Sequence, residues 1–90
     1  PKLFDAFCLR GVSKYYLKDY EGAFEDLSKA IELNPSSEKP FYNRGIIKNA
    51  LDDYEGAIED YSKAVELNSS SELSFLNRGN AKFNLSAQPA

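Results

Sequence analysis

The stretch Asp19-Tyr20-Glu21-Gly22-Ala23 returns further along the chain as Asp53-Tyr54-Glu55-Gly56-Ala57, a period of 34 residues. Residues 4–37 and 38–71 align without a gap, and about 20 of the 34 paired residues are identical. Such a period is typical of repeat proteins, in which each repeat packs against its neighbours. We therefore predict repeats at 4–37 and 38–71, the first helix of a third repeat or a capping helix at 72–85, and a tail at 86–90.

Each repeat is expected to form two helices. Phe4, Phe7 and Gly11 are spaced i, i+3 and i+7, which places them on one face of a first helix. Asp19 is positioned to cap the second helix. Asn34, followed by a proline, is expected to end that helix in the left-handed conformation.

A glycine recurs in each first helix, at Gly11, Gly45 and Gly79. Glycine inside a helix costs about 1 kcal/mol, so its repetition indicates a close approach between helices. An aromatic residue stands four positions before each glycine, and we expect these side chains in the core: Phe7, Phe41 and Phe75.

Composition limits the class of protein. With 90 residues and 42% hydrophobic residues, the chain can form one small domain with a thin margin of stability. No apolar run approaches the roughly 18 residues of a membrane span, so no membrane partner is expected. The net charge of −3 disfavours nucleic acid. Cys8 is the single cysteine, which leaves the compartment open and favours a reducing one such as the cytoplasm.

The repeated pattern resembles the tetratricopeptide repeat. The resemblance lies in aromatic-x3-Gly, then Asp-Tyr-x2-Ala, then Lys-Ala-hydrophobic-Glu-Leu-Asn, and covers Phe4 to about Leu85. It implies an all-α, right-handed superhelical solenoid of antiparallel helix pairs with about five helices. It also implies a protein-binding scaffold.

Two positions depart from the usual pattern of the family. Arginine precedes each glycine, and lysine follows it three residues later. Because a buried unpaired arginine is costly, each arginine is expected to pair with an acid of a second helix, such as Asp26 or Asp60.

In the family, the first helices form the concave wall, which often holds an extended peptide or a partner helix. Mapped onto this chain, that wall offers aromatic, aliphatic and amide side chains. Amides can hydrogen-bond both groups of a peptide backbone, and aromatic rings supply contact area. The predicted peptide-binding residues are Val12, Tyr15, Tyr42, Asn43, Ile46, Asn49, Leu76, Asn77, Asn80 and Phe83. Further positions on the wall are Asp5, Cys8, Leu9, Lys39 and Leu73.

Some relatives grip the carboxylate end of a chaperone with five residues: lysine, two asparagines, lysine and arginine. The matching positions here hold Cys8, Val12, Asn43, Leu73 and Asn77, of which only Asn43 agrees. A doubly anionic peptide end is therefore disfavoured, and a neutral or partly apolar ligand is expected.

Catalysis, metal binding and cofactors are not predicted. The chain has no histidine, the commonest general base and metal ligand, and Cys8 has no partner to activate it. The acids are expected on solvated helix faces, in pairs such as Glu25 with Lys29. Tyr15-Tyr16 beside lysines resembles a base-stacking site, but the acidic balance argues against it.

A second interpretation is structural. No second helix follows 72–85, so Phe75, Leu76 and Phe83 are expected to be partly exposed. The chain would then serve as a spacer or self-association module, with homodimers forming through this last helix.

Overall fold

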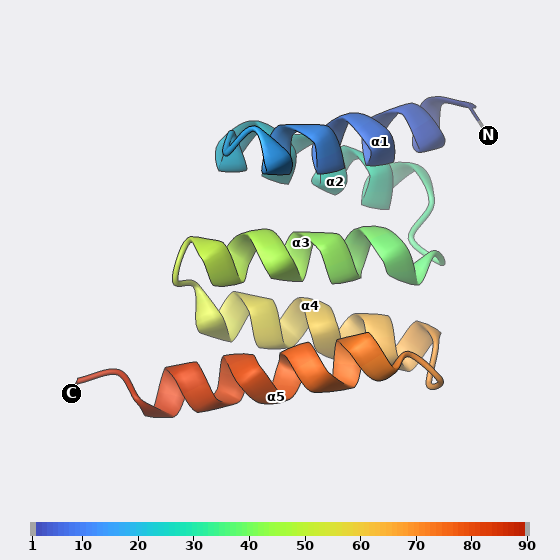
Figure 1. The fold of residues 1–90 in the computed structure, drawn as a ribbon. Coiled ribbons are helices and arrows are strands. Elements are labelled where there is room, and N and C mark those ends of the chain that lie inside the picture. Colours follow the sequence, from blue (N-terminus) through green and yellow to red (C-terminus); the bar gives the residue numbers. More distant parts are fainter. Residues whose placement is uncertain (1, 90) are drawn as a thin grey trace.

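The structure is a computed structural model that describes residues 2–89. Within those residues it contains helices and no strands. The helices run antiparallel in sequence order (Figure 1). They are α1 (Lys2–Tyr16), α2 (Tyr20–Leu33), α3 (Glu38–Ala50), α4 (Tyr54–Leu67) and α5 (Glu72–Ser86). Helix α5 ends one residue later than predicted, and Ala90 of the predicted tail lies outside the described residues.

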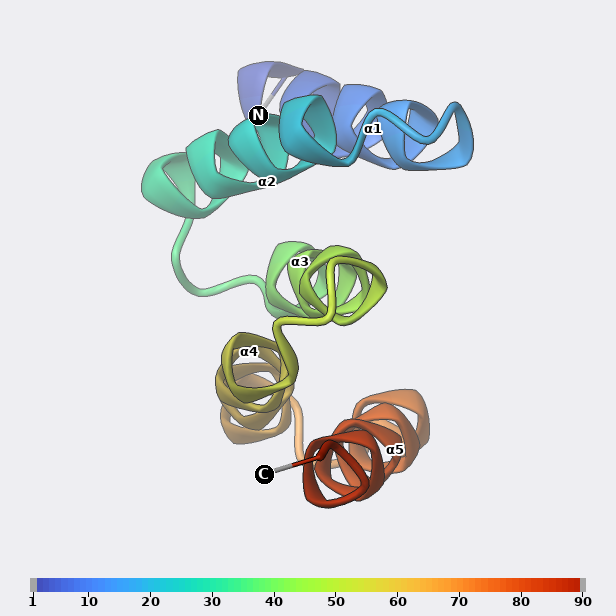
Figure 2. The ribbon, with the colours of Figure 1, turned by 90° about the vertical axis from the view of Figure 1, so that its left-hand side faces the viewer.

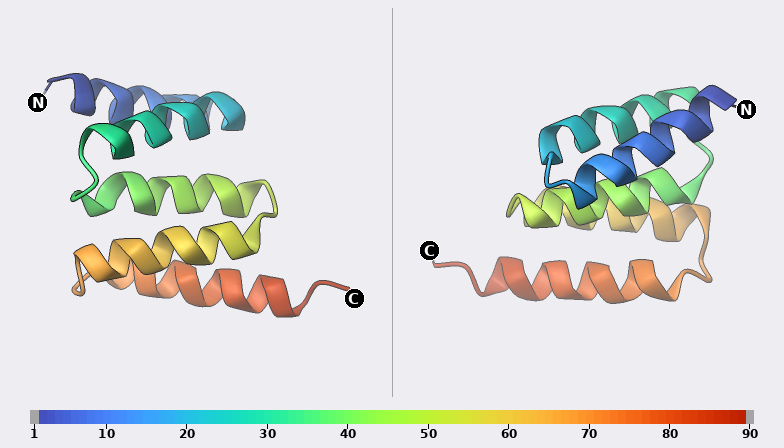
Figure 3. Two further views of the ribbon diagram at one scale, coloured as in Figure 1. Left: turned by 180° about the vertical axis from the view of Figure 1, so that it is seen from behind. Right: turned by 45° about the horizontal axis from the view of Figure 1, so that its top comes forward.

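The helices form two layers. Figure 2 shows α1, α3 and α5 on one side and α2 and α4 on the other. Seen from behind and from above, the helices follow one another in sequence order along an elongated body of 43 × 29 × 17 Å (Figure 3). None of the helices in residues 2–89 has the length and apolar character needed to cross a membrane.

Close packing within each repeat depends on its glycine. A Cβ atom built on Gly11 would lie 2.9 Å from Leu27 Cγ, and one built on Gly45 would lie 2.7 Å from the Tyr61 ring. Real Cβ atoms do not come so close, so only glycine lets α2 and α4 seat these large side chains. Gly79 differs, because a Cβ there would meet nothing within 4 Å.

The core consists of two buried clusters, each of which joins the second helix of one repeat to the first helix that follows it. One buried cluster joins Ala23, Leu27 and Ile47, and the other joins Ala57, Tyr61 and Ala81. Of the three predicted core aromatics, only Phe41 is buried, whereas Phe7 is partly buried. Phe75 is 45% exposed, because no helix of residues 2–89 covers α5 on the side away from α4. Its expected place in the core was therefore wrong, whereas its expected partial exposure is confirmed.

The helix caps agree with the sequence in one respect and differ in another. Asp19 Oδ1 accepts a hydrogen bond from Gly22 N at 3.0 Å, and Asp53 repeats the contact with Gly56. Asn34 is not left-handed as predicted, since its φ is −149°. Its side chain instead accepts from Ser36 N at 3.1 Å. Two residues with a left-handed conformation, Lys18 (φ 65°) and Asp52 (φ 63°), lie in the turns between the two helices of each repeat.

The predicted pairing of the arginines is confirmed in two of three cases. Arg10 Nε and Nη2 each donate to Asp26 at 2.8 Å, and Arg44 donates to Asp60 in the same way. Arg78 makes no such ion pair within residues 2–89 and donates to Ser62 Oγ at 3.3 Å.

The surface pairs differ from expectation. Lys29 Nζ lies 3.9 Å from Glu32 Oε1, one turn further along, and within residues 2–89 it forms no ion pair with Glu25. The equivalent Lys63 likewise pairs with Glu66, at 3.2 Å.

Candidate functional site

The surface of α1, α3 and α5 that points away from α2 and α4 is here called the inner face. Figure 2 shows α3 set back between α1 and α5 on this side. Two pockets open along it, one between α1 and α3 and one between α3 and α5. They bring together side chains from all three helices of the layer.

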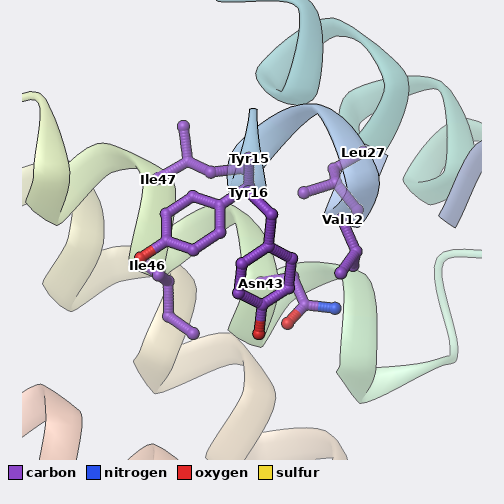
Figure 4. A pocket seen from close by; sticks show the side chains of 7 residues that line it. All are labelled: Val12, Tyr15, Tyr16, Leu27, Asn43, Ile46 and Ile47. Carbon is purple, nitrogen blue, oxygen red and sulfur yellow. The ribbon is translucent and has the colours of Figure 1, made fainter. Parts of the chain in front are cut away.

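The first pocket, called the Tyr15 pocket, is small, at about 50 Å³. A cavity of this volume holds one or two water molecules. Figure 4 shows its lining from α1, α2 and α3. The residues are Val12, Tyr15, Tyr16, Leu27, Asn43, Ile46 and Ile47. Leu27 and Ile47 are buried core residues, so the floor of the pocket is rigid and apolar.

The second pocket, called the Lys39 pocket, is larger, at about 320 Å³. Its lining mixes charged, polar and apolar groups: Glu38, Lys39, Tyr42, Asn43, Ser71 and Leu73. Asn43 lines both pockets and so connects them. Beside it, Asn77 Nδ2 donates to the Tyr42 hydroxyl at 3.0 Å, which ties α5 to α3 across the face.

The predicted residues of α5 lie beyond the two pockets. Leu76 is 61% exposed and Phe83 is 71% exposed, while Asn80 is exposed as well. They continue the inner face as an open surface. Asn77 is the member of this group that contacts another predicted residue.

Two predicted residues are held partly inside the protein. Tyr15 packs against the first core cluster, and its ring centroid lies 5.8 Å from that of Tyr20. The Oδ1 atom of Asn49 is buried and has no hydrogen-bond partner among residues 2–89, and Asn49 lines neither pocket. The geometry therefore groups Asn49 with the interior and not with the accessible surface.

The sequence prediction missed Tyr16, Glu38 and Ser71. Tyr16 lines the Tyr15 pocket and is 77% exposed. A signal was present, because Tyr16 lies four residues after Val12 and shares its side of the helix. Glu38 and Ser71 each begin or precede a helix, and only the stacking of α3 beside α5 brings them to one pocket.

Arg10 and Lys14 of α1 pair with Asp26, and Arg44 and Lys48 of α3 pair with Asp60. Lys14 Nζ lies 3.2 Å from Asp26 Oδ2, and Lys48 lies at the same distance from Asp60. Hydrogen bonds from Arg10 hold the pKa of Asp26 below its usual range; burial opposes this and Lys14 adds to it. Among pocket residues, Lys39 therefore remains as a cation, next to the acid Glu38.

No group of three or more histidine, cysteine, aspartate or glutamate side chains in residues 2–89 is placed to hold a metal ion. Burial raises the pKa of the Cys8 thiol, with a further contribution from Asp5. A thiol with a raised pKa is a poorer nucleophile at neutral pH.

The family model of the tetratricopeptide repeat matches residues 4–37 and 39–71, well over half of the chain. The chain belongs to the tetratricopeptide repeat family. The predicted all-α solenoid is confirmed, and the family is one of protein-interaction scaffolds. No protein of curated function matches the sequence.

Solved tetratricopeptide repeat (TPR) domains have the same fold. The second TPR of Spaghetti (RPAP3), bound to the HSP90 peptide SRMEEVD, is 25% identical with a TM-score of 0.91, covering 93% of this chain and 78% of that one. The Arabidopsis OM64 TPR domain is 24% identical with a TM-score of 0.92, over 94% and 70% of the two chains. The TPR2B domain of yeast Sti1, in a complex with pHsp70, is 19% identical with a TM-score of 0.92, over 94% and 68%.

Proposed function

We propose that the inner face binds an extended peptide or a helix of a partner protein. The proposed units of the chain are one repeat at 4–37, a second at 38–71, and the first helix of a third repeat or a capping helix at 72–85. The observation that carries this proposal is the pair of pockets joined at Asn43, which spans α1, α3 and α5. The residues assigned to binding are those predicted from the sequence, with Tyr16 added and Asn49 given a supporting place. They are Val12, Tyr15, Tyr16, Tyr42, Asn43, Ile46, Leu76, Asn77, Asn80 and Phe83.

The chemistry of this surface suits a peptide backbone with apolar side chains. The Asn43 amide can donate to a carbonyl and accept from an N–H group of an extended chain. The Asn77–Tyr42 hydrogen bond fixes a second amide beside it, which lowers the entropy lost on binding. The apolar floor of the Tyr15 pocket would receive a small apolar group of the ligand.

The ligand is proposed to be neutral or partly apolar and not a chaperone carboxylate end. The arginines and lysines of α1 and α3 that would attract acids are paired with Asp26 and Asp60. The HSP90 peptide bound to the RPAP3 domain carries two glutamates and an aspartate. The inner face here offers such a peptide little positive charge.

A peptide-library selection on the purified chain tests the proposal. The Tyr42→Phe, Asn43→Ala, Asn77→Ala variant removes the polar groups and keeps the Tyr42 ring against Tyr61, which protects the fold. Glu25→Ala, at an exposed position of α2, is the matched control. A consensus peptide that binds the control and not the triple variant would support the inner face. A consensus that binds both equally would overturn it.

The charge assignment has its own test. Cys8→Lys, Val12→Asn, Leu73→Lys and Asn77→Arg together give the five-residue set that the family resemblance assigns to chaperone ends. We expect the unaltered chain to bind SRMEEVD with a Kd no better than about 1 mM, and the variant to bind at least about tenfold more tightly. Fluorescence anisotropy measures both. Tight binding by the unaltered chain would contradict the proposed ligand class.

Self-association is the second candidate function, favoured by the exposure of Leu76 and Phe83 on α5. A homodimer would bury these side chains against a second copy. Light scattering over a concentration series would show a mass that rises toward the dimer, and Leu76→Ser with Phe83→Ser would abolish the rise. A monomer at every concentration would remove this candidate.

No catalytic step is proposed for these residues. The raised pKa of the Cys8 thiol and the absence of histidine from the sequence leave the inner face with binding groups alone.

A further inference from the structure

A further pocket lies where the beginning of α2 meets the turn between α3 and α4. Figure 1 shows these two segments at the same edge of the molecule. The pocket, called the Phe24 pocket, has a volume of about 260 Å³ and is lined by Glu21, Phe24, Glu25, Lys48, Leu51 and Asp53. It lies between two complete helix pairs, and it shares no lining residue with the two pockets of the inner face.

The floor of the Phe24 pocket is apolar and open to solvent. Phe24 is 37% exposed and Leu51 is 49% exposed. The Phe24 ring is held from the protein side, because Arg44 Cζ and Lys48 Nζ lie 5.7 and 5.8 Å from its centroid. Both cations are in turn paired with Asp60, at 2.8 and 3.2 Å. The ring is therefore fixed before a ligand arrives, which lowers the entropy lost on binding.

The rim of the pocket carries negative charge that the protein does not neutralise. Glu21, Glu25 and Asp53 are exposed and form no ion pair within residues 2–89. Glu21 and Glu25 lie four residues apart on α2, a spacing at which like charges repel each other. The one cation of the lining, Lys48, is shared with Asp60 and is only 15% exposed. The rim therefore favours a cationic ligand and disfavours an acidic one.

The size of the pocket limits what can enter it. Sites that enclose a whole small molecule have volumes of about 300–1,000 Å³, so this smaller and open pocket suits a single side chain of a larger ligand. An apolar side chain would cover the exposed floor, and cations on either side of it would reach the carboxylates of the rim.

We propose that the Phe24 pocket binds a segment of a partner protein in which a leucine, or an apolar residue of similar size, is flanked by arginines. The leucine would pack on Phe24 and Leu51, and the arginines would pair with Glu21 and Glu25. The proposal goes beyond the inner face and uses none of its residues.

The second repeat offers an internal comparison. It has the same pair of acids at the equivalent positions, Glu55 and Glu59. It lacks the aromatic floor, because isoleucine stands at 58 where the first repeat has Phe24. It also lacks the third acid, because the position equivalent to Asp53 is Ala87. The strong site is therefore expected once in the chain, and the second pair of acids gives a control of equal charge.

The probe is the fluorescein-labelled peptide Gly-Arg-Arg-Leu-Arg-Arg-Gly, added to the full chain and followed by fluorescence anisotropy. We expect one saturable site with a Kd below about 1 mM, weakened as salt is raised from about 0.05 M to about 0.5 M. Serine in place of the peptide's leucine should weaken binding at least about fivefold, because the apolar contact is lost. Glutamate in place of its arginines should abolish saturable binding.

Protein variants locate the site. Glu21→Gln with Glu25→Gln should weaken binding at least about threefold, whereas Glu55→Gln with Glu59→Gln, of the same net charge, should bind like the parent. Leu51→Ser should weaken binding at least about fivefold. All five side chains are exposed, so each variant should keep the helical circular dichroism and unfolding midpoint of the parent. The triple variant of the inner face should bind this peptide unchanged, so the two surfaces are tested separately.

Any of four results would overturn the proposal. One is no saturable binding up to about 1 mM peptide. Another is an equal loss for the two pairs of glutamine substitutions, which would assign binding to the net charge of the chain. The third is binding that is indifferent to Leu51→Ser or to serine in the peptide. The fourth is a homodimer that Leu51→Ser dissociates while the peptide does not bind, which would assign the pocket to a second copy.

Discussion

At the scale of single residues, Gly45 and Gly79 hold the same place in successive repeats and have opposite surroundings. Gly45→Ala would put a methyl group against the Tyr61 ring and should lower the free energy of unfolding, since overpacking costs about 1–3 kcal/mol and outweighs the helix propensity of alanine. Gly79→Ala would bring the added methyl group into no such contact, so it should raise the free energy of unfolding by about 0.5–1 kcal/mol. Urea titration followed by circular dichroism measures both. Equal shifts of the same sign would contradict the packing argument.

Asp26 supplies a prediction about pH. Its pKa is held below the usual value of about 3.9, first by hydrogen bonds from Arg10. The pairing therefore stabilises the fold fully above about pH 4 and is lost as the pH falls through the folded-state pKa. Asp26→Asn should be less stable than the parent at pH 7, and the difference should shrink as the pH falls from about 4 toward 2. A difference that is constant from pH 7 to pH 2 would show that the carboxylate charge plays no part.

At the same scale, the sequence could predict residue pairs but not always residue orientation. The arginine–aspartate pairs followed from the cost of burying an unpaired charge, which is a general rule. Tyr15 and Tyr16 are adjacent in a helix and point about 100° apart, so the sequence alone does not say which of the two is more exposed. The tertiary stacking of α1 on α3 decides this, and it made Tyr16 the more exposed member of the pocket.

At the scale of helices, capping gives a matched pair of substitutions. Asp53 caps α4 through Gly56 N, and Asp53→Ala should cost about 1 kcal/mol of stability. Ser37 holds the same position at α3, but its side chain makes no capping hydrogen bond. Ser37→Ala should therefore change stability by less than about 0.5 kcal/mol. Thermal unfolding compares the two, and an equal loss for both would rule out the capping bond as the cause.

The helix boundaries were predictable because period and capping residues act locally. The geometry of the connections was not. Lys18 takes a left-handed conformation although neither glycine nor asparagine stands there, because the turn must bring α2 back against α1. Asn34 could have taken that conformation and is extended, since the connection to α3 leads to the next repeat. In both cases the packing of helices overrides the preference of the residue.

At the scale of the whole molecule, the helices form a linear array in which each one contacts chiefly its neighbours in sequence. The stability of such an array is close to a sum of terms between neighbours, so the ends should open before the middle. Helix α3 is packed between α2 and α4, whereas α5 is covered by α4 and leaves Gly79 open.

Hydrogen exchange should follow this order. Amides of α3 and α4 should exchange slowest, and those of α5 should exchange faster by at least about tenfold, since a difference of 1.4 kcal/mol in local opening suffices. Gly45→Ala should speed exchange in α3 and α4 more than in α1, because the perturbed contact with Tyr61 lies between those two helices. Equal protection of all five helices would instead show one cooperative unit, in which the open face of α5 carries no energetic cost.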